Sequence, residues 1–532
     1  MDGPGPPPAA TAVASRDLLA GLVAWVAVVT VGTWTARTSV PLANDDVAYA
    51  LDACALARLD GLAWGPGYAA VYCGLRHVFT DPLIAFWAKQ AAVPLLAGLL
   101  VHRLGLAFRL GPVLAPLSAL WCVLALLTVS GTVEFAFVLG LAACLAAASG
   151  GRWRWVWFFA LMGLALLVRV EYIVGVAGAV ALLLGRHEEG TRPGVTAGAF
   201  VLAGFLVLLV AADQGAAGRS WFAFGQQFAV NYAEARGLDV DPFVEWQRVA
   251  GQAFPSSRSI ADALRENPRM AAWHLGYNAL VRMPRAVAGA LVPVPSFVPW
   301  LRGRAVLAAL VVALVLLAAL AGGRRDWLRG SQMLSPIAFA AIPAVSLIFR
   351  PQPRHLLPLL PLSIVIVGTR LRGRTDERHS RLTAGLRLAF AGVLLAGLAG
   401  VWAAWLRPAT GEASVDGWIR ELRRESQAGR VRLLASWYGD RACGLVGPGC
   451  RAIPLGDFIE GAEVDAALIG PDWAARPDVR GDARVRGFCS QPERFGCRAR
   501  AVTPDGFRLV RCRPPLRLPP RASPPPGDGP SG

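Results

Sequence analysis

Long apolar runs recur through most of the chain, and they constrain its fold more than any other feature. A helix needs about 20 apolar residues to cross a bilayer, and fewer where protein packs around it. The chain has 532 residues, 55% of them hydrophobic and only 17% charged, which is too apolar for a soluble multidomain protein. We therefore expect an all-α polytopic membrane protein with about eleven transmembrane helices. The expected spans are 18–36, 83–101, 112–129, 133–149, 155–168, 171–184, 195–212, 304–321, 333–349, 355–370 and 385–405.

The arginines indicate which ends of these helices face the cytoplasm, because short cytoplasmic loops are enriched in arginine. Eleven spans with the N-terminus inside give arginine to every cytoplasmic loop. The alternative is one continuous helix over 155–184. The chain would then have ten spans, and every later segment would lie on the opposite side of the membrane. It would place Arg169 and Glu171 near mid-membrane, where charge is costly, so a hairpin of two short spans is favoured.

This topology predicts the domain organisation. The start of the chain lacks the basic region and cleavage site of a secretory signal, so the first apolar run is expected to remain as an anchor. The C-terminal region then lies outside the cytoplasm. The expected parts are a disordered cytoplasmic N-terminus at 1–16, a transmembrane domain at 17–405 with outer loops 37–82 and 213–303, an extracytoplasmic domain at 406–512, and a proline-rich disordered tail at 513–532.

The C-terminal region has the pattern of a small α/β domain with disulfides. The segments VRLLASW, AALIGPDW and FRLVRC are typical of short strands separated by Gly/Pro turns. Five cysteines in an oxidising compartment favour disulfides, and the nearest pairs are 443–450 and 489–497, although five cysteines leave the connectivity open. Metal binding is the alternative, but no CxxC or cysteine/histidine ligand spacing is present.

Two adjacent carboxylates follow the first expected span. Asp45 and Asp46 repel each other and are desolvated by neighbouring protein, which raises a carboxyl pKa and suits one of them to general-base catalysis. The alternative is structural: with Asn44 they could cap the start of the next helix.

A basic cluster lies in the outer loop between two late spans. The cluster contains Arg350, Arg354 and His355. Arginine is usually found in cytoplasmic loops and is disfavoured in short outer loops, so an anionic partner is expected here. Arginine matches phosphate by bidentate hydrogen bonds, and a polyprenyl-phosphate headgroup would lie at this depth. Contact with ordinary lipid phosphate is the alternative.

Further charges lie in other outer turns. Glu134 is in SGTVEF, and Arg169 and Glu171 are in the turn of the expected hairpin. They could be structural ion pairs, or they could join Asp45, Asp46 and Arg354 in one charged pocket. The amphipathic stretch 270–285 suits interfacial helices that either shape an acceptor cleft or form a passive lid.

In order and orientation these motifs resemble the GT-C superfamily of polyprenyl-phosphate-sugar-dependent glycosyltransferases, which includes protein mannosyltransferases and the aminoarabinose transferases of lipid A. The resemblance covers residues 15–405. It rests on Asp45-Asp46 with Tyr49, Trp64-Gly65-Pro66-Gly67-Tyr68, Glu134, Leu167-Val168-Arg169-Val170-Glu171 and Arg354-His355-Leu356-Leu357-Pro358. Asp46 stands where the family usually has Glu, and His355 where it has Tyr.

The resemblance implies a GT-C-like fold in a bacterial-type plasma membrane and an inverting sugar transfer on its extracytoplasmic face. It implies that Asp45 is the general base and that Asp46 adjusts the pKa of Asp45 or orients the acceptor. It also implies that Arg354 stabilises the leaving phosphate. Arg350, His355 and Arg169 would assist with the donor, and Tyr49, Pro66, Tyr68, Glu134 and Glu171 would line the pocket. No cofactor or metal is implied. The partners would be the bilayer, the polyprenyl-phosphate sugar, and a glycan, lipid or protein acceptor.

Two other functions fit a polytopic chain. A transporter or flippase predicts internal repeats and polar groups at mid-bilayer, whereas here the charges lie at the outer ends of spans. A non-catalytic envelope assembly protein would use the C-terminal domain for interaction. Nucleic-acid binding is not expected despite the net charge of +17, because the arginines fall in short loops between apolar runs.

Overall fold

The structure is a computed structural model, and the chain divides into two compact units. The first contains residues 1–34 and 52–407, and the second contains residues 35–51 and 408–532. The structure describes residues 45–52, 54, 66–108, 110–128, 133–149, 153–185, 191–211, 213–238, 240, 242, 245–291, 334–371, 415–435, 439–470, 473, 479, 481–502 and 508–519.

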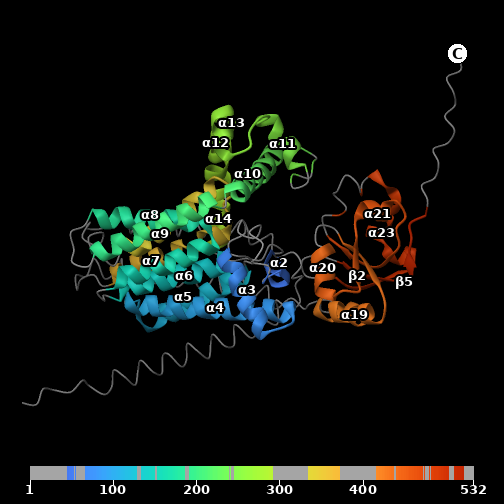
Figure 1. The fold of residues 1–532 in the computed structure, drawn as a ribbon, viewed down its shortest axis with the longest axis horizontal. Coiled ribbons are helices and arrows are strands. Elements are labelled where there is room, and N and C mark those ends of the chain that lie inside the picture. Colours follow the sequence, from blue (N-terminus) through green and yellow to red (C-terminus); the bar gives the residue numbers. More distant parts are fainter. Residues whose placement is uncertain are drawn as a thin grey trace, which may run out of the picture. The chain divides into compact units, whose positions relative to one another are not determined.

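Helices α3 to α9 of the first unit pack side by side as a bundle (Figure 1). Proline and capping set where the second of them begins: Asp81 accepts a hydrogen bond of 2.8 Å from the backbone N–H of Leu83, and Pro82 occupies the first turn. The helices are α3 (Pro66–Val78), α4 (Pro82–Ala107), α5 (Gly111–Thr128), α6 (Val133–Ala148), α7 (Arg154–Val168), α8 (Ile173–Leu184) and α9 (Thr191–Ala211).

Residues 155–184 form a hairpin, as the charges in its turn predicted. Arg169 leaves the helical conformation, with φ −144° and ψ 114°, and ends α7. A Cβ at Gly194 of α9 would contact both Trp155 and Leu183. Since Trp155 lies at the start of α7 and Leu183 at the end of α8, the two helices run antiparallel. A continuous helix is therefore excluded.

The predicted number of spans is only partly matched by helices of membrane-spanning length. Within the described residues, one helix, Pro82–Ala107, is long and apolar enough to cross a membrane. Shorter apolar helices cover Leu114–Val123, Glu134–Ala148, Arg154–Val168, Val170–Leu184 and Leu334–Leu347. The expected spans at 18–36, 304–321 and 385–405 lie outside the described residues, so the total of eleven stays a prediction.

The long loop after α9 is helical and has an aromatic core. Its elements are α10 (Asp213–Arg236), α11 (Trp246–Ala253), α12 (Ile260–Glu266), α13 (Pro268–Tyr277), the π-helix η5 (Asn278–Arg282) and α14 (Met283–Leu291). Phe224 and Phe228 of α10 pack with Phe254, and Phe349 of a later segment joins the same cluster. The predicted stretch 270–285 is thus helical, but its position at a membrane interface stays a prediction.

The late segments of the first unit are short and irregular. They are α16 (Leu334–Ala340), the 3₁₀ helices η8 (Ile342–Leu347) and η9 (Pro353–Leu356), and α17 (Leu359–Leu371). Prolines explain the breaks, because Pro343 lies in the first turn of η8, Pro353 begins η9 and proline removes a backbone donor. The short helix η4 (Val170–Tyr172) similarly forms the turn between α7 and α8.

The second unit is an α/β domain, as predicted, with one five-stranded sheet in the order β2-β1-β3-β5-β4. Strands β2, β1 and β3 run parallel, and β5 pairs antiparallel with β3 and β4. The three predicted strands are present as β1, β3 and β5. The strands are β1 (Val431–Ala435), β2 (Cys450–Ile453), β3 (Val464–Ile469), β4 (Cys497–Val502) and β5 (Arg508–Leu516); the principal helices are α2 (Asp45–Asp52), α19 (Val415–Ala428), α20 (Gly439–Val446), α21 (Leu455–Ile459) and α23 (Ala483–Ser490).

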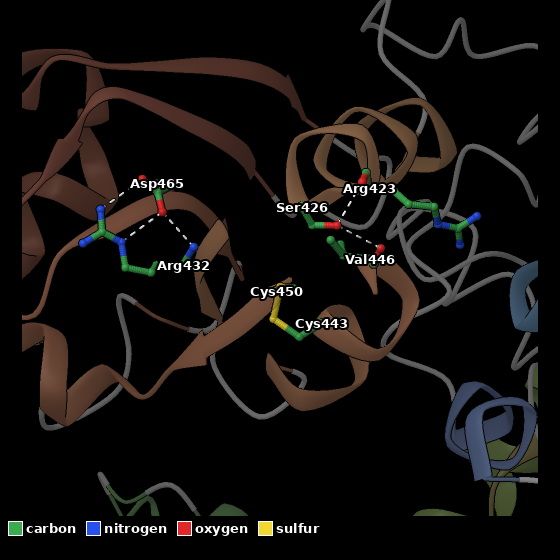
Figure 2. The surroundings of a disulfide bond; sticks show 7 residues. All are labelled: Arg423, Ser426, Arg432, Cys443, Val446, Cys450 and Asp465. Atoms are coloured by element: carbon green, nitrogen blue, oxygen red, sulfur yellow. Dashed lines mark hydrogen bonds and ion pairs between the residues drawn. A yellow bond between two sulfur atoms is a disulfide. The ribbon is translucent and has the colours of Figure 1, made fainter. Parts of the chain in front are cut away.

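The disulfides of this domain confirm one predicted pair and contradict the other. Cys443 and Cys450 are joined and link α20 to β2 (Figure 2). Cys497 is bonded to Cys512, not to Cys489, which is buried in the core of the domain. The reason is register: Cys497 and Cys512 face each other across β4 and β5, a pairing that sequence distance does not reveal. Strand β5 also runs to Leu516, past the predicted domain end at 512.

Candidate functional site

One end of the helical bundle collects charged residues from separate parts of the chain. Glu134 lies in the first turn of α6, and η4 carries Glu171 directly after Arg169. The segment η9, with Arg354 and His355, packs against α6 and against α14. All five residues were predicted from the sequence to lie on one side. The opposite end of the α7–α8 hairpin carries the connection to α9.

The most buried ion pair at this end joins α4 and α6. Lys89 Nζ lies 2.7 Å from Glu134 Oε2, and the two side chains are 1% and 0% exposed. The ammonium also lies 5.7 Å from the ring centroid of Tyr68 on α3, so the pair connects three helices. Sequence reasoning missed Lys89 as a site residue. The available signal was a charge inside an apolar run, carried by the only lysine in the chain.

A second ion pair forms the turn of the hairpin. Arg169 donates to both carboxylate oxygens of Glu171, from Nη2 at 2.6 Å and from Nε at 3.1 Å. The side chains are 22% and 23% exposed, so the pair is only partly accessible to solvent. A Cβ at Gly67 would lie 3.2 Å from backbone and side-chain atoms of Leu167, which brings the start of α3 and Tyr68 close to this turn.

The two arginines of the late loop face different neighbours. His355 is within electrostatic range of Arg354, Arg169 and Glu171, which places the η9 end of the loop beside the hairpin turn.

Arg350 instead interacts electrostatically with Arg282, Glu234, Arg285 and Tyr277 of the outer-loop helices. The sequence grouped Arg350 with Arg354 for one ligand. In the structure the Arg350 side chain lies toward the outer-loop helices, and Arg354, Arg169 and Glu171 each lie within electrostatic range of His355.

The predicted acidic pair belongs to the other unit. Helix α2 begins at Asp45, and the side chains of Asp45, Asp46 and Pro66 lie outside the described residues. Tyr49 on α2 is buried. Catalysis by the acidic pair therefore stays a prediction.

One group of side chains within the described residues has the composition of a metal site. The ligand atoms of Cys54, Cys73 and His77 all lie within 4.8 Å of one another. Cys54 and Cys73 form a disulfide, which the sequence analysis did not predict, and this bond occupies both sulfurs. In this oxidised form only His77 is available as a ligand.

Comparison with known proteins yields distant structural likenesses. No protein-family model and no curated protein matches the chain. The structure is similar to the archaeal oligosaccharyltransferase AglB from Archaeoglobus fulgidus, solved in complex with an inhibitory peptide and a dolichol-phosphate. The TM-score is 0.43 and the identity 12%, over 94% of this chain and 76% of that chain. A likeness of this extent assigns neither a family nor an activity.

Proposed function

We propose that the chain is a membrane glycosyltransferase of the GT-C kind, which moves a sugar from a polyprenyl-phosphate donor to an acceptor on the extracytoplasmic face. One observation carries the proposal: the bundle end that holds Glu134 also holds Arg169, Glu171, Arg354 and His355, which come from three distant segments. These are the residues of three motifs that resemble the superfamily in order.

The charges at this end suit a phosphate leaving group. Arg169 and Glu171 form a mostly buried pair, and Arg354 lies in the loop whose His355 is within electrostatic range of both. In the proposed reaction the guanidinium of Arg354 binds the donor phosphate and stabilises the negative charge that develops as the glycosidic C–O bond breaks. The Lys89–Glu134 pair, buried at the same end, holds α4 and α6 together.

The proposed base is Asp45. It accepts the proton of the acceptor hydroxyl or amine as that atom attacks the anomeric carbon, and Asp46 keeps the pKa of Asp45 raised by its like charge. This assignment is supported by the resemblance of Asp45, Asp46 and Tyr49 to the first-loop motif of the superfamily.

The test is transfer of radiolabelled sugar from the membrane polyprenyl-phosphate pool to endogenous acceptors. Asp45→Asn should abolish transfer in protein that is folded and membrane-inserted. Asp81→Asn is the matched control, because asparagine can still cap α4 and transfer should persist. Equal transfer by wild type and Asp45→Asn would eliminate Asp45 as the base.

A second variant tests the phosphate-binding role. Arg354→Lys keeps the positive charge but loses the bidentate geometry, so the KM for the donor should rise by about 10-fold or more. An unchanged KM for the donor would contradict the assignment of Arg354.

A further inference from the structure

A buried polar cluster joins the outer-loop helices to the segment that precedes Arg350. Asn231 of α10, His274 of α13 and Asn278 of η5 are each 0% exposed, and Arg282 is 6% exposed. Buried polar side chains are costly unless they are hydrogen-bonded, so each of these groups needs a partner.

The partners include three consecutive backbone carbonyls at the end of η8. A helix end leaves its last carbonyls without partners inside the helix. Asn278 Nδ2 donates to the carbonyl oxygens of Leu347 and Phe349, at 2.8 Å each. His274 Nε2 lies 3.1 Å from the carbonyl oxygen of Ile348 between them. Two side chains of the outer loop therefore cap the helix that leads into the arginine-bearing loop.

The hydrogen bonds fit one assignment of protons. Since a carbonyl oxygen can only accept, His274 Nε2 carries the hydrogen and Nδ1 is the acceptor. Asn231 Nδ2 donates to His274 Nδ1 at 3.2 Å and to Asn278 Oδ1 at 2.8 Å. Asn278 Nδ2 and His274 Nε2 lie 3.1 Å apart, but both carry hydrogens that they donate to backbone carbonyls. This short distance is therefore not a hydrogen bond.

The same hydrogen-bond network includes charged residues. Asn231 Oδ1 accepts from Arg282 Nε at 2.9 Å, and Arg282 Nη2 donates to Glu234. Glu234 also accepts from Arg285 Nη1 at 3.0 Å. Both groups of the Asn231 amide are thus used, and a flip of that amide would place donors against Arg282. The cluster has a single arrangement, and it holds residues 347–349 in one place.

We propose that His274 and Asn278 are positioning residues for the donor-binding loop: by capping residues 347–349 they set the orientation of Arg350 and Arg354. The inference rests on the proposed function, because it assigns a purpose to the loop that binds the donor phosphate. Arg350 follows Phe349 directly, and η9 begins at Pro353, so a displaced cap displaces both arginines. Neither His274 nor Asn278 contacts the donor in this proposal.

The decisive variant is Asn278→Asp, which keeps the size of the side chain and replaces its donor group with an acceptor. Carboxylate oxygens would then face the carbonyls of Leu347 and Phe349. Hydrogen exchange of full-length protein in detergent should rise about 10- to 100-fold in the 347–356 peptide. The KM for the donor should rise by a similar factor, with the KM for the acceptor unchanged.

Asn267→Asp is the matched control on the neighbouring helix. It keeps the oxygen that caps α13 through the N–H of Met270 and loses only a donor to the Ala253 carbonyl, at 3.1 Å. It should leave exchange in 347–356 and the KM for the donor at wild-type values.

A second comparison uses His274. Glutamine can both donate to Ile348 and accept from Asn231, whereas phenylalanine can do neither, so His274→Gln should retain more donor affinity than His274→Phe. Equal donor KM values for these two variants would overturn the proposal.

The outcomes separate the two proposals. Unchanged exchange in folded Asn278→Asp, or raised exchange with an unchanged donor KM, would overturn the positioning role. Absence of transfer by the wild type itself would overturn the proposed function, while the exchange experiment would still decide whether the cap holds the loop.

Discussion

The burial of the Lys89–Glu134 pair makes a quantitative prediction about the stability of the first unit. Both side chains are excluded from solvent and their charged atoms are 2.7 Å apart. Removal of one partner of a buried pair typically costs about 3–5 kcal/mol, because the remaining charge keeps its desolvation penalty. Glu134→Gln should therefore lower the free energy of unfolding by about 3–5 kcal/mol.

The neutral double variant should behave differently. Lys89→Met combined with Glu134→Gln leaves no charge at the site, and replacement of a whole buried pair is often neutral. The double variant should recover most of the loss, which gives a coupling free energy of about 2–4 kcal/mol. The assay is denaturant unfolding of the full chain in detergent micelles, with all four members of the cycle measured under one condition.

An exposed pair on the second unit provides the comparison. Arg500 and Glu421 are each 38% exposed and lie 3.2 Å apart, so solvent screening should limit their coupling to about 0–1 kcal/mol. Equal coupling in the two cycles would refute the argument from burial. A double variant as unstable as Glu134→Gln would refute the claim that the unbalanced charge causes the loss.

Three other predictions follow from the packing, the bonding and the buried histidine. Gly198→Ala should destabilise the first unit by about 1–3 kcal/mol in the same unfolding assay, because its Cβ would lie 2.6 Å from a side chain of α8, whereas Gly204→Ala meets nothing within 4 Å. Cys512→Ser should cost about 3 kcal/mol of stability, since it opens a disulfide with a sequence separation of 15, whereas Cys489→Ser should leave the disulfide map by mass spectrometry unchanged. Burial lowers the pKa of His274 from its usual 6.5 to about 4. The neutral form therefore contributes stability that is complete above pH 6.5 and is lost as the pH falls toward 4. His274→Gln should flatten this part of a plot of melting temperature against pH.

Each of these has a clear contrary result. Equal destabilisation by both alanine variants would contradict the close packing of α9. A disulfide to residue 489 in the wild type would contradict the strand register. A wild-type melting temperature that is constant between pH 6.5 and 4 would contradict the neutral, buried state of the histidine.

Local features of the sequence were enough to predict several elements. The cost of placing Arg169 and Glu171 in mid-membrane predicted a break in residues 155–184, and the structure has that break at Arg169. Alternating apolar segments between Gly/Pro turns predicted three of the five strands. These predictions succeed because they depend on burial and backbone preferences of neighbouring residues.

Long-range pairings were decided only by the tertiary structure. Lys89 meets Glu134 across two helices, and His274 reaches the carbonyl of Ile348, which is 74 residues away in the chain. Cys497 bonds Cys512 because the register of β4 and β5 places them opposite each other. No periodicity in the sequence encodes such contacts. They arise when each apolar surface finds its complementary neighbour, and the polar groups buried in the process take the partners that this packing brings within reach.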